Sequence, residues 1–220
     1  MNSLIDILKM IDSLTDYLKE KNFKFSREGY PIFTKDMFLE EVPEVIVPIN
    51  HRKNKRVVNK KKTVICLFCG DIHIYRRLIR LIDEIDEYKE YMGVIGSDIT
   101  VTKDMEIEWQ RVIILLNQMI MAVFAVNGIK IILNTRTGSK ETRDMFKYMP
   151  KNIIVASGFR GGTRKYEKLN YTYIAKILSI RPSQLLIYGK CHKLVLNNIY
   201  KMGIDCIVYP DFRELCKEVA

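Results

Sequence analysis

The stretch Ile129–Phe146, IKIILNTRTGSKETRDMF, decides how the fold is interpreted. It opens with a mostly apolar run, Ile129–Leu133, in which polar and apolar residues do not alternate. A strand of this kind is buried on both faces, as in a parallel sheet. A polar loop, Asn134–Ser139, follows at once and leads into a predicted helix from Lys140. The stretch therefore predicts a strand, a loop and a helix in succession, which is the repeating unit of an α/β fold.

The same unit recurs along the chain from Thr63 onward. Further strands are predicted at Thr63–Phe68, Met92–Gly96, Asn152–Ala156, Gln184–Tyr188 and Asp205–Tyr209. Helices are predicted at residues 72–88, 104–127, 140–148, 171–180 and 192–202, with Asp211 capping a final one. Six βα units of this kind predict an α/β fold with a mainly parallel sheet. The sheet is either open and doubly wound or a partial barrel, because both architectures share this alternation.

The first part of the chain has a different pattern. Residues 3–21 place leucine and isoleucine at helical spacing, which predicts an amphipathic helix. The segment EVIVPI, with Pro43 before it and Pro48 inside it, is typical of a short edge strand. We therefore divide the chain into an N-terminal helix and extension (residues 1–50), a basic linker (residues 51–62) and an α/β domain (residues 63–220).

The longest apolar stretch, Val112–Val126, is shorter than the roughly 20 residues that cross a bilayer. We interpret it as a buried core helix and expect no membrane association. Asn117 and Gln118 lie at its centre and either bond across the core or reach toward the strand ends.

The chain has five cysteines and no basic start followed by an apolar leader, so we expect reduced thiols in a cytoplasmic protein. Cys66 and Cys69 have CxxC spacing, but no second CxxC or histidine pair lies at zinc-site spacing. We therefore expect Cys66 to be a buried structural thiol and predict no metal site. The sequence predicts no particular cofactor and no particular oligomeric state.

The net charge of +10 is concentrated in one segment, His51–Lys62, which has seven lysines and arginines and no acidic residue. These seven residues are Arg52, Lys53, Lys55, Arg56, Lys60, Lys61 and Lys62, here called the basic strip. The functional interpretation is contact with DNA or RNA through phosphates. The alternative is a solvated arm that keeps the protein soluble.

Polar residues follow the predicted strands. The carboxyl ends of parallel strands share one edge, called the rim below, where loops lead into helix N-termini that favour anions. Asp71 follows the first of the six predicted strands, and Asp98 follows the second. Asn134, Arg136, Gly138 and Ser139 follow the third, and Ser157 and Arg160 follow the fourth. The two arginines would clamp a phosphate or carboxylate. Alternatively, Asp71, Asp98 and Ser139 cap helices and Arg160 is a surface residue.

Several of these segments also carry a family resemblance. The segments GVIGSDITVTKDM, WQRVIILLNQ, NGIKIILNTRTGS, NIIVASG and PSQLLIYGK occur in this order. Together they resemble domain of unknown function family 4417, over roughly residues 68–190. The resemblance implies an origin in phages, plasmids or other mobile elements, and it supplies no reaction. Asp98 corresponds to an aspartate of the family pattern, so the resemblance points to the same rim.

Three functions are compatible with this sequence. The first is a protein that binds nucleic acid or a phosphate-bearing small molecule at the rim. The second is an enzyme on a nucleotide or phosphorylated substrate, with Asp71 and Asp98 as general base or metal ligands. The third is a phage factor that binds and modulates a host protein. The chain has no Walker loop, G-x-S-x-G motif or protein-kinase motif set, so whether it is an enzyme stays open.

Overall fold

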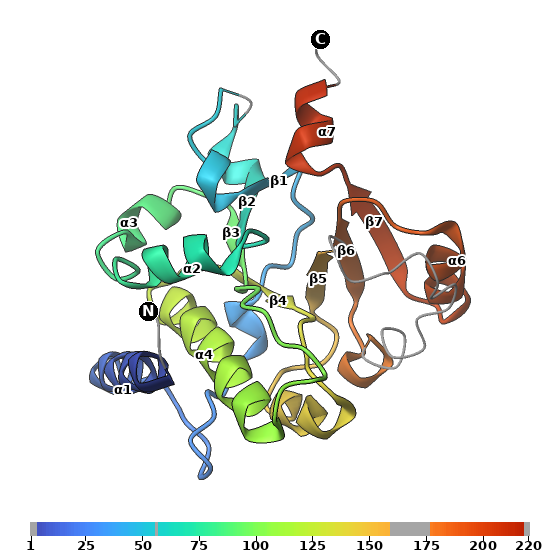
Figure 1. Ribbon diagram of the computed structural model, residues 1–220. Helices are drawn as coiled ribbons and strands as arrows, with labels where there is room; N and C mark the ends of the chain where they lie inside the picture. Colours follow the sequence, from blue (N-terminus) through green and yellow to red (C-terminus); the bar gives the residue numbers. More distant parts are fainter. Residues whose placement is uncertain (1–3, 56, 159–176, 218–220) are drawn as a thin grey trace.

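The computed structural model describes residues 4–55, 57–158 and 177–217 (Figure 1). Within them, seven strands form one sheet in the order β1 to β7, and every neighbouring pair is parallel. The strands are β1 (Val45–Pro48), β2 (Thr63–Cys66), β3 (Gly93–Ile95), β4 (Ile131–Asn134), β5 (Ile154–Gly158), β6 (Gln184–Tyr188) and β7 (Asp205–Tyr209). The predicted α/β class and parallel sheet are confirmed, and β1 adds a seventh strand to the six predicted units.

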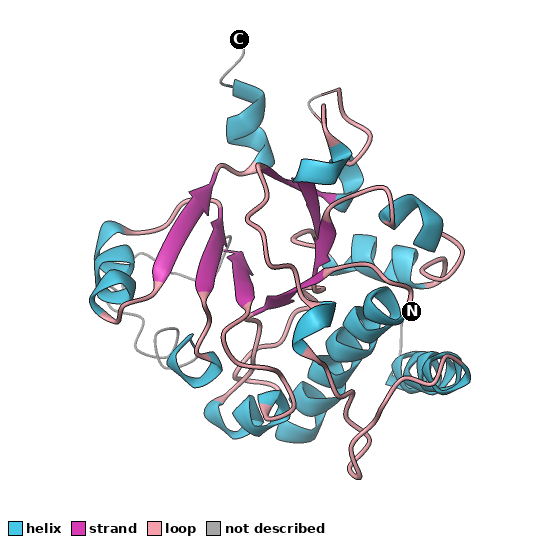
Figure 2. Ribbon diagram, turned by 180° about the vertical axis from the view of Figure 1, so that it is seen from behind, coloured by secondary structure: helices cyan, strands magenta, loops and turns pink. Residues whose placement is uncertain are grey.

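The sequential strand order decides between the two predicted architectures. In a doubly wound sheet the order reverses at a switch point. Here each strand adds to the same edge of the sheet, so right-handed crossovers place the connecting helices on one face. The sheet accordingly curls into a half barrel with helices around its outside (Figures 1 and 2). The partial barrel is thus the observed alternative.

The α-helices are α1 (Leu4–Glu20), α2 (Asp71–Leu78), α3 (Ile85–Tyr88), α4 (Ile107–Val126), α6 (Lys193–Lys201) and α7 (Phe212–Lys217). Short 3-10 helices are η1 (Lys35–Met37), η2 (Ile49–His51), η3 (Lys60–Lys62) and η4 (Lys140–Phe146). The single helix predicted at 72–88 is two helices, because turns with i to i−3 hydrogen bonds interrupt it at Arg80 and Leu81. The helix predicted at 171–180 lies mostly outside the described residues.

Both faces of the sheet are buried, which explains why the strands lack an alternating pattern. The concave face contributes Val64, Ile95, Ile132, Ile154 and Leu186 to an inner core. The convex face contributes Ile65, Val94, Ile131, Leu133 and Val155 to a larger core under the helices. Each side chain of this size stabilises the fold by about 1.5–3 kcal/mol when it is fully buried.

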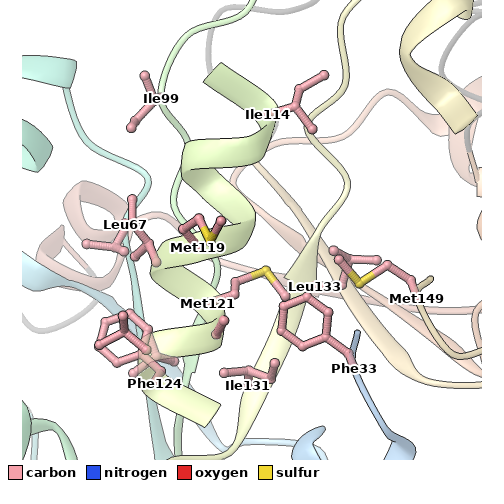
Figure 3. Close-up of a cluster of buried hydrophobic side chains, with 14 of the residues drawn as sticks. Phe33, Leu67, Ile99, Ile114, Met119, Met121, Phe124, Ile131, Leu133 and Met149 are labelled. Carbon is pink, nitrogen blue, oxygen red and sulfur yellow. The ribbon is translucent and has the colours of Figure 1, made fainter. Parts of the chain in front are cut away.

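Helix α4 lies at the centre of the larger core. In Figure 3, Met121 of α4 lies beside Leu133 of β4 and Phe33 of the N-terminal extension. On its other side α4 packs against α1, and Asn127 Nδ2 lies 3.0 Å from the Tyr17 hydroxyl. Among the described residues, α4 alone is long and apolar enough to span a membrane, yet most of it is buried inside the protein. It packs as the core helix that the sequence predicts.

The N-terminal extension crosses the open side of the half barrel, where residues 38–44 run from η1 to β1 (Figure 2). The Leu39 amide donates to the Ile131 carbonyl at 2.9 Å. At the rim, the Tyr209 hydroxyl of β7 donates to the Pro43 carbonyl at 2.6 Å. The His51 and Phe212 rings stack with centroids 3.8 Å apart. The first contact ties the extension to the central strand β4, and the other two link segments next to β1 with β7 and α7. The proposed division at residues 51–62 stays a prediction, although β1 on one side of it pairs with β2 on the other.

Candidate functional site

Asp98, Asn134 and Arg136 form a connected group at the rim. Asn134 Nδ2 donates to Asp98 Oδ1 at 3.1 Å and to the Ser97 carbonyl at 3.0 Å. Asn134 Oδ1 accepts from the Arg136 backbone N–H at 3.1 Å. The Arg136 Nε atom lies 3.6 Å from Asp98 Oδ1. Asn134 is buried, because it ends β4 beside β3 and β5. It therefore holds the loops after two neighbouring strands in a fixed relation, as we expected for strand ends at one edge.

A pocket opens beside this group, between α4, β4 and η4. It measures about 250 Å³, including the part that is open to solvent. Its lining consists of Ser97, Ile114, Asn117, Gln118, Met121, Leu133, Asn134, Arg136 and Phe146. The charged and polar groups of the rim thus continue into a partly apolar recess behind them.

Three polar atoms of the pocket lining are buried without a hydrogen-bond partner among the described residues. They are Asn117 Nδ2, Gln118 Oε1 and Arg136 Nε. The other end of each amide is engaged: the Ser97 hydroxyl donates to Asn117 Oδ1, and Gln118 Nε2 donates to the Met145 carbonyl at 2.9 Å. A buried polar group without a partner costs about 1–3 kcal/mol and is uncommon in native proteins. Such atoms gathered in one pocket favour a binding site. They also show that both alternatives for Asn117 and Gln118 hold, since these residues bond within the core and reach the rim.

The rim loop after β4 is held from beneath by Gln110, a fully buried residue of α4 that sequence reasoning did not select. Gln110 Oε1 accepts from the Ser139 backbone N–H at 2.7 Å and from its hydroxyl at 3.1 Å. Gln110 Nε2 donates to the Met105 carbonyl at 2.7 Å. Ser139 occupies the N-cap position of η4, but its hydroxyl makes no capping bond to that helix. One signal was available, because Gln110 shares a helix face with the polar residues seven and eight positions later.

Gly138 is the point of closest approach in this loop. A Cβ atom at this position would lie 1.9 Å from Gln110 Oε1 and 3.0 Å from Val101 Cγ1. The absent side chain therefore makes room for Gln110. A contact between Gly138 and a ligand stays a prediction.

Asp71 lies at the start of α2 and joins the same rim through Thr100. Asp71 Oδ1 accepts from the Thr100 backbone N–H at 3.2 Å and from its hydroxyl at 3.1 Å. Burial, together with the nearby charges of Asp98 and Asp71, raises the pKa of the Cys69 thiol to about 11. Both carboxylates therefore influence the same thiol. No catalytic role of either aspartate follows from this placement alone.

Ser157 lies on β5, the strand next to β4. Ser157 is buried on β5, between Ala156, which belongs to the inner core, and Gly158, whose Cα faces the Phe68 ring. Side chains alternate along a strand, so Ser157 faces the helical layer instead. Arg160 lies outside the described residues, and the predicted two-arginine clamp stays a prediction.

The structure describes the candidate metal ligands and thiols of residues 4–55, 57–158 and 177–217. In these ranges no three His, Cys, Asp or Glu side chains are grouped to hold a metal ion. Cys66 is a fully buried free thiol, and burial raises its pKa well above the ordinary value. Cys66 is therefore a structural thiol, as expected.

The basic strip is largely paired with carboxylates. Arg52 is buried and donates from Nε and Nη2 to both carboxylate oxygens of Glu87 at 2.9 Å. Further ion pairs join Lys53 to Glu87 at 3.2 Å, Lys60 to Glu90, and Lys62 to Glu44. The Lys61 ammonium donates to the Lys89 carbonyl at 3.0 Å. Lys55 is exposed, and Arg56 lies outside the described residues. Arg52 thus packs against Glu87 of α3, whereas the paired lysines keep between 44% and 75% of their side chains exposed, so the solvated interpretation stays a prediction.

Comparison with known proteins gives one match. A family model described as Domain of unknown function (DUF4417) matches residues 29–209. This match confirms the resemblance predicted over residues 68–190 and extends it to most of the half barrel. No curated protein and no solved structure matches the chain.

Proposed function

The chain belongs to the family described as Domain of unknown function (DUF4417), and we propose that it binds a small phosphate-bearing ligand at the rim of the half barrel. In this proposal Arg136 binds the anion. Asp98 and Asn134 hold the Arg136 loop in the binding geometry. The ligand lies over the pocket lined by α4 and β4.

The observation that carries the proposal is the Asp98–Asn134–Arg136 group beside buried unpaired polar atoms. Asp98 Oδ1 lies 3.6 Å from Arg136 Nε, which is an ion pair longer than a hydrogen bond, and the guanidinium has five N–H donors in total. The Arg136 side chain is 30% exposed, so it is held by the protein and still reaches solvent. A planar, held guanidinium suits the bidentate recognition of phosphate.

Nucleic acid at the basic strip is a second candidate. It is supported by Lys53, which is 75% exposed, and by exposed Lys55. Against it, four cations of the strip pair with carboxylates and would have to exchange these partners for phosphates. We therefore favour the small ligand. Use of Asp98 as a general base on that ligand, an origin in a mobile element and action on a host protein are further hypotheses.

The test is calorimetric titration of the full chain with inorganic phosphate, glycerol 3-phosphate and a nucleoside monophosphate. Arg136→Gln is expected to weaken binding at least about tenfold, because one charge-assisted contact contributes about 1.5–3 kcal/mol. Arg136→Lys keeps the positive charge but loses the planar guanidinium that donates two parallel hydrogen bonds, and is expected to give an intermediate affinity.

Arg111→Gln is the matched control. Arg111 is 31% exposed and pairs with Asp144 at 3.0 Å, so it resembles Arg136 in exposure and partner. Its replacement is expected to leave binding unchanged. Circular dichroism of each variant shows that it is folded. The proposal is wrong if no phosphate compound binds, or if Arg111→Gln and Arg136→Gln reduce binding equally.

A further inference from the structure

We infer that the ligand carries a hydroxyl group next to its phosphate, and that this hydroxyl enters the inner part of the pocket behind Arg136. The inference rests on the proposed function and narrows the ligand to phosphate monoesters of polyols or sugars. It is carried by the hydrogen-bonding character of the pocket, its size and its position relative to Arg136.

The hydrogen-bonding character follows from the three buried polar atoms that lack a hydrogen bond among the described residues. Asn117 Nδ2 and Arg136 Nε are donors, whereas Gln118 Oε1 is an acceptor. The orientations of both amides are set by their bonded ends, since Asn117 Oδ1 accepts from Ser97 and Gln118 Nε2 donates to Met145. Gln118 is only 3% exposed, so its oxygen has little access to bulk solvent. The pocket therefore presents two donors and one acceptor.

A hydroxyl group matches this set atom for atom. It has one O–H donor and two acceptor lone pairs. It can donate to Gln118 Oε1 and accept from Asn117 Nδ2 and Arg136 Nε. A phosphate or carboxylate oxygen has no hydrogen to donate, so it would leave Gln118 Oε1 unsatisfied. An ammonium group has no lone pair, so it would leave both donors unsatisfied.

The size of the pocket supports the same choice. Its walls include the apolar side chains Ile114, Met121, Leu133 and Phe146. The enclosed space of the pocket admits a group about the size of one water molecule. A hydroxyl fits this space, whereas a carboxamide or a nucleobase does not.

The position of the pocket connects the hydroxyl to the phosphate. Arg136 and Asn134 line the pocket and also belong to the rim group with Asp98. One ligand can therefore place its phosphate on the solvent-facing side of Arg136 and its hydroxyl behind it. This geometry requires the two groups to lie close together on one small molecule.

The experiment compares glycerol 3-phosphate with propyl phosphate, which has the same carbon chain and no hydroxyl. The full chain is expected to bind glycerol 3-phosphate at least about tenfold more tightly. In Asn117→Asp this ratio of dissociation constants is expected to fall toward 1. Aspartate keeps an acceptor for Ser97 but replaces the unpaired N–H donor by an oxygen. Its added charge near Arg136 acts on both phosphates alike, so it cancels in the ratio.

Asn127→Asp is the matched control, because it makes the same chemical change just past the end of α4, outside the pocket lining. Asn127 bonds to Tyr17 and to the Val123 carbonyl, and its replacement is expected to leave the ratio unchanged. Equal affinity of the wild-type chain for the two compounds would overturn the hydroxyl inference and leave the phosphate proposal standing. A ratio that survives Asn117→Asp would also overturn it. If neither compound binds but inorganic phosphate or the nucleoside monophosphate does, the hydroxyl inference is overturned; if none of the four binds, the proposed function itself is wrong. The wild-type ratio needs no variant, so the inference stays testable even if a variant does not fold.

Discussion

The substitution Gly138→Ala is expected to destabilise the protein through a single contact. A Cβ atom at residue 138 would lie 1.9 Å from Gln110 Oε1 and 2.9 Å from Gln110 Cδ. Both distances are far inside van der Waals contact. Gln110 is fully buried, so it has little room to turn aside and would have to leave its site.

The magnitude follows from the bonds that Gln110 makes. It accepts from the Ser139 N–H and hydroxyl and donates to the Met105 carbonyl. Each bond contributes about 1 kcal/mol net, so losing all three lowers the free energy of unfolding by about 3 kcal/mol. The loop that carries Arg136 would lose its support at the same time. Phosphate affinity is therefore expected to fall together with stability.

The assay is urea denaturation followed by circular dichroism, with unfolding free energies taken by linear extrapolation. Gly70→Ala is the matched control, because a Cβ there would meet only His73 Cδ2 at 3.9 Å; its effect should stay below about 0.5 kcal/mol. A double variant with Gln110→Ala tests the cause, since removing Gln110 first should abolish most of the Gly138→Ala effect. Additive effects, or a loss below about 0.5 kcal/mol for Gly138→Ala, would refute the reasoning.

Three further predictions concern residues outside the pocket. The Arg52 hydrogen bond holds the pKa of Glu87 below its ordinary value, so the stability it gives is present near neutral pH and is lost as the pH falls. Glu87→Gln should therefore lower the unfolding free energy by about 2 kcal/mol at pH 7, with a smaller difference from wild type below about pH 4 in urea melts. Because burial raises the pKa of Cys69 to about 11, iodoacetamide at pH 8 should alkylate it about 100-fold more slowly in the native protein than in urea, by mass spectrometry. Duplex DNA binding to the basic strip can be followed by fluorescence anisotropy at increasing salt concentration. Because four of the seven cations are already paired with carboxylates, the logarithm of the binding constant should fall against the logarithm of the salt concentration with a slope nearer about −3 than about −6.

Local patterns predicted most of the strands, because buried parallel strands are short apolar runs that need no partner to be recognised. The segment around Val45–Pro48 was recognised as a strand, but its place beside β2 depends on pairing with residues about eighteen positions later. The choice between an open sheet and a half barrel depends on strand order. Strand order is a property of the crossovers and leaves no local trace in the sequence.

The rim group was predictable in part, because the carboxyl ends of neighbouring parallel strands must meet. Asp98, Asn134 and Arg136 were predicted to lie together for this reason, and they do. It could not place Ser157, since which face a strand-end residue takes depends on where the strand stops. The wall of the pocket comes from α4, a helix that strand-end reasoning ignores, and so Gln110 was missed. The ion pairs of the basic strip were missed because their partner carboxylates are distant in the chain.

The most direct test of the proposed site is nuclear magnetic resonance of the arginine side-chain Nε–Hε groups during titration with glycerol 3-phosphate. The Arg136 signal, assigned by its loss in Arg136→Lys, is expected to shift in proportion to occupancy. The Arg52 signal should stay in place, because that guanidinium is already bound to Glu87. A titration in which Arg136 does not shift, or in which Arg52 moves instead, would contradict phosphate binding at the rim.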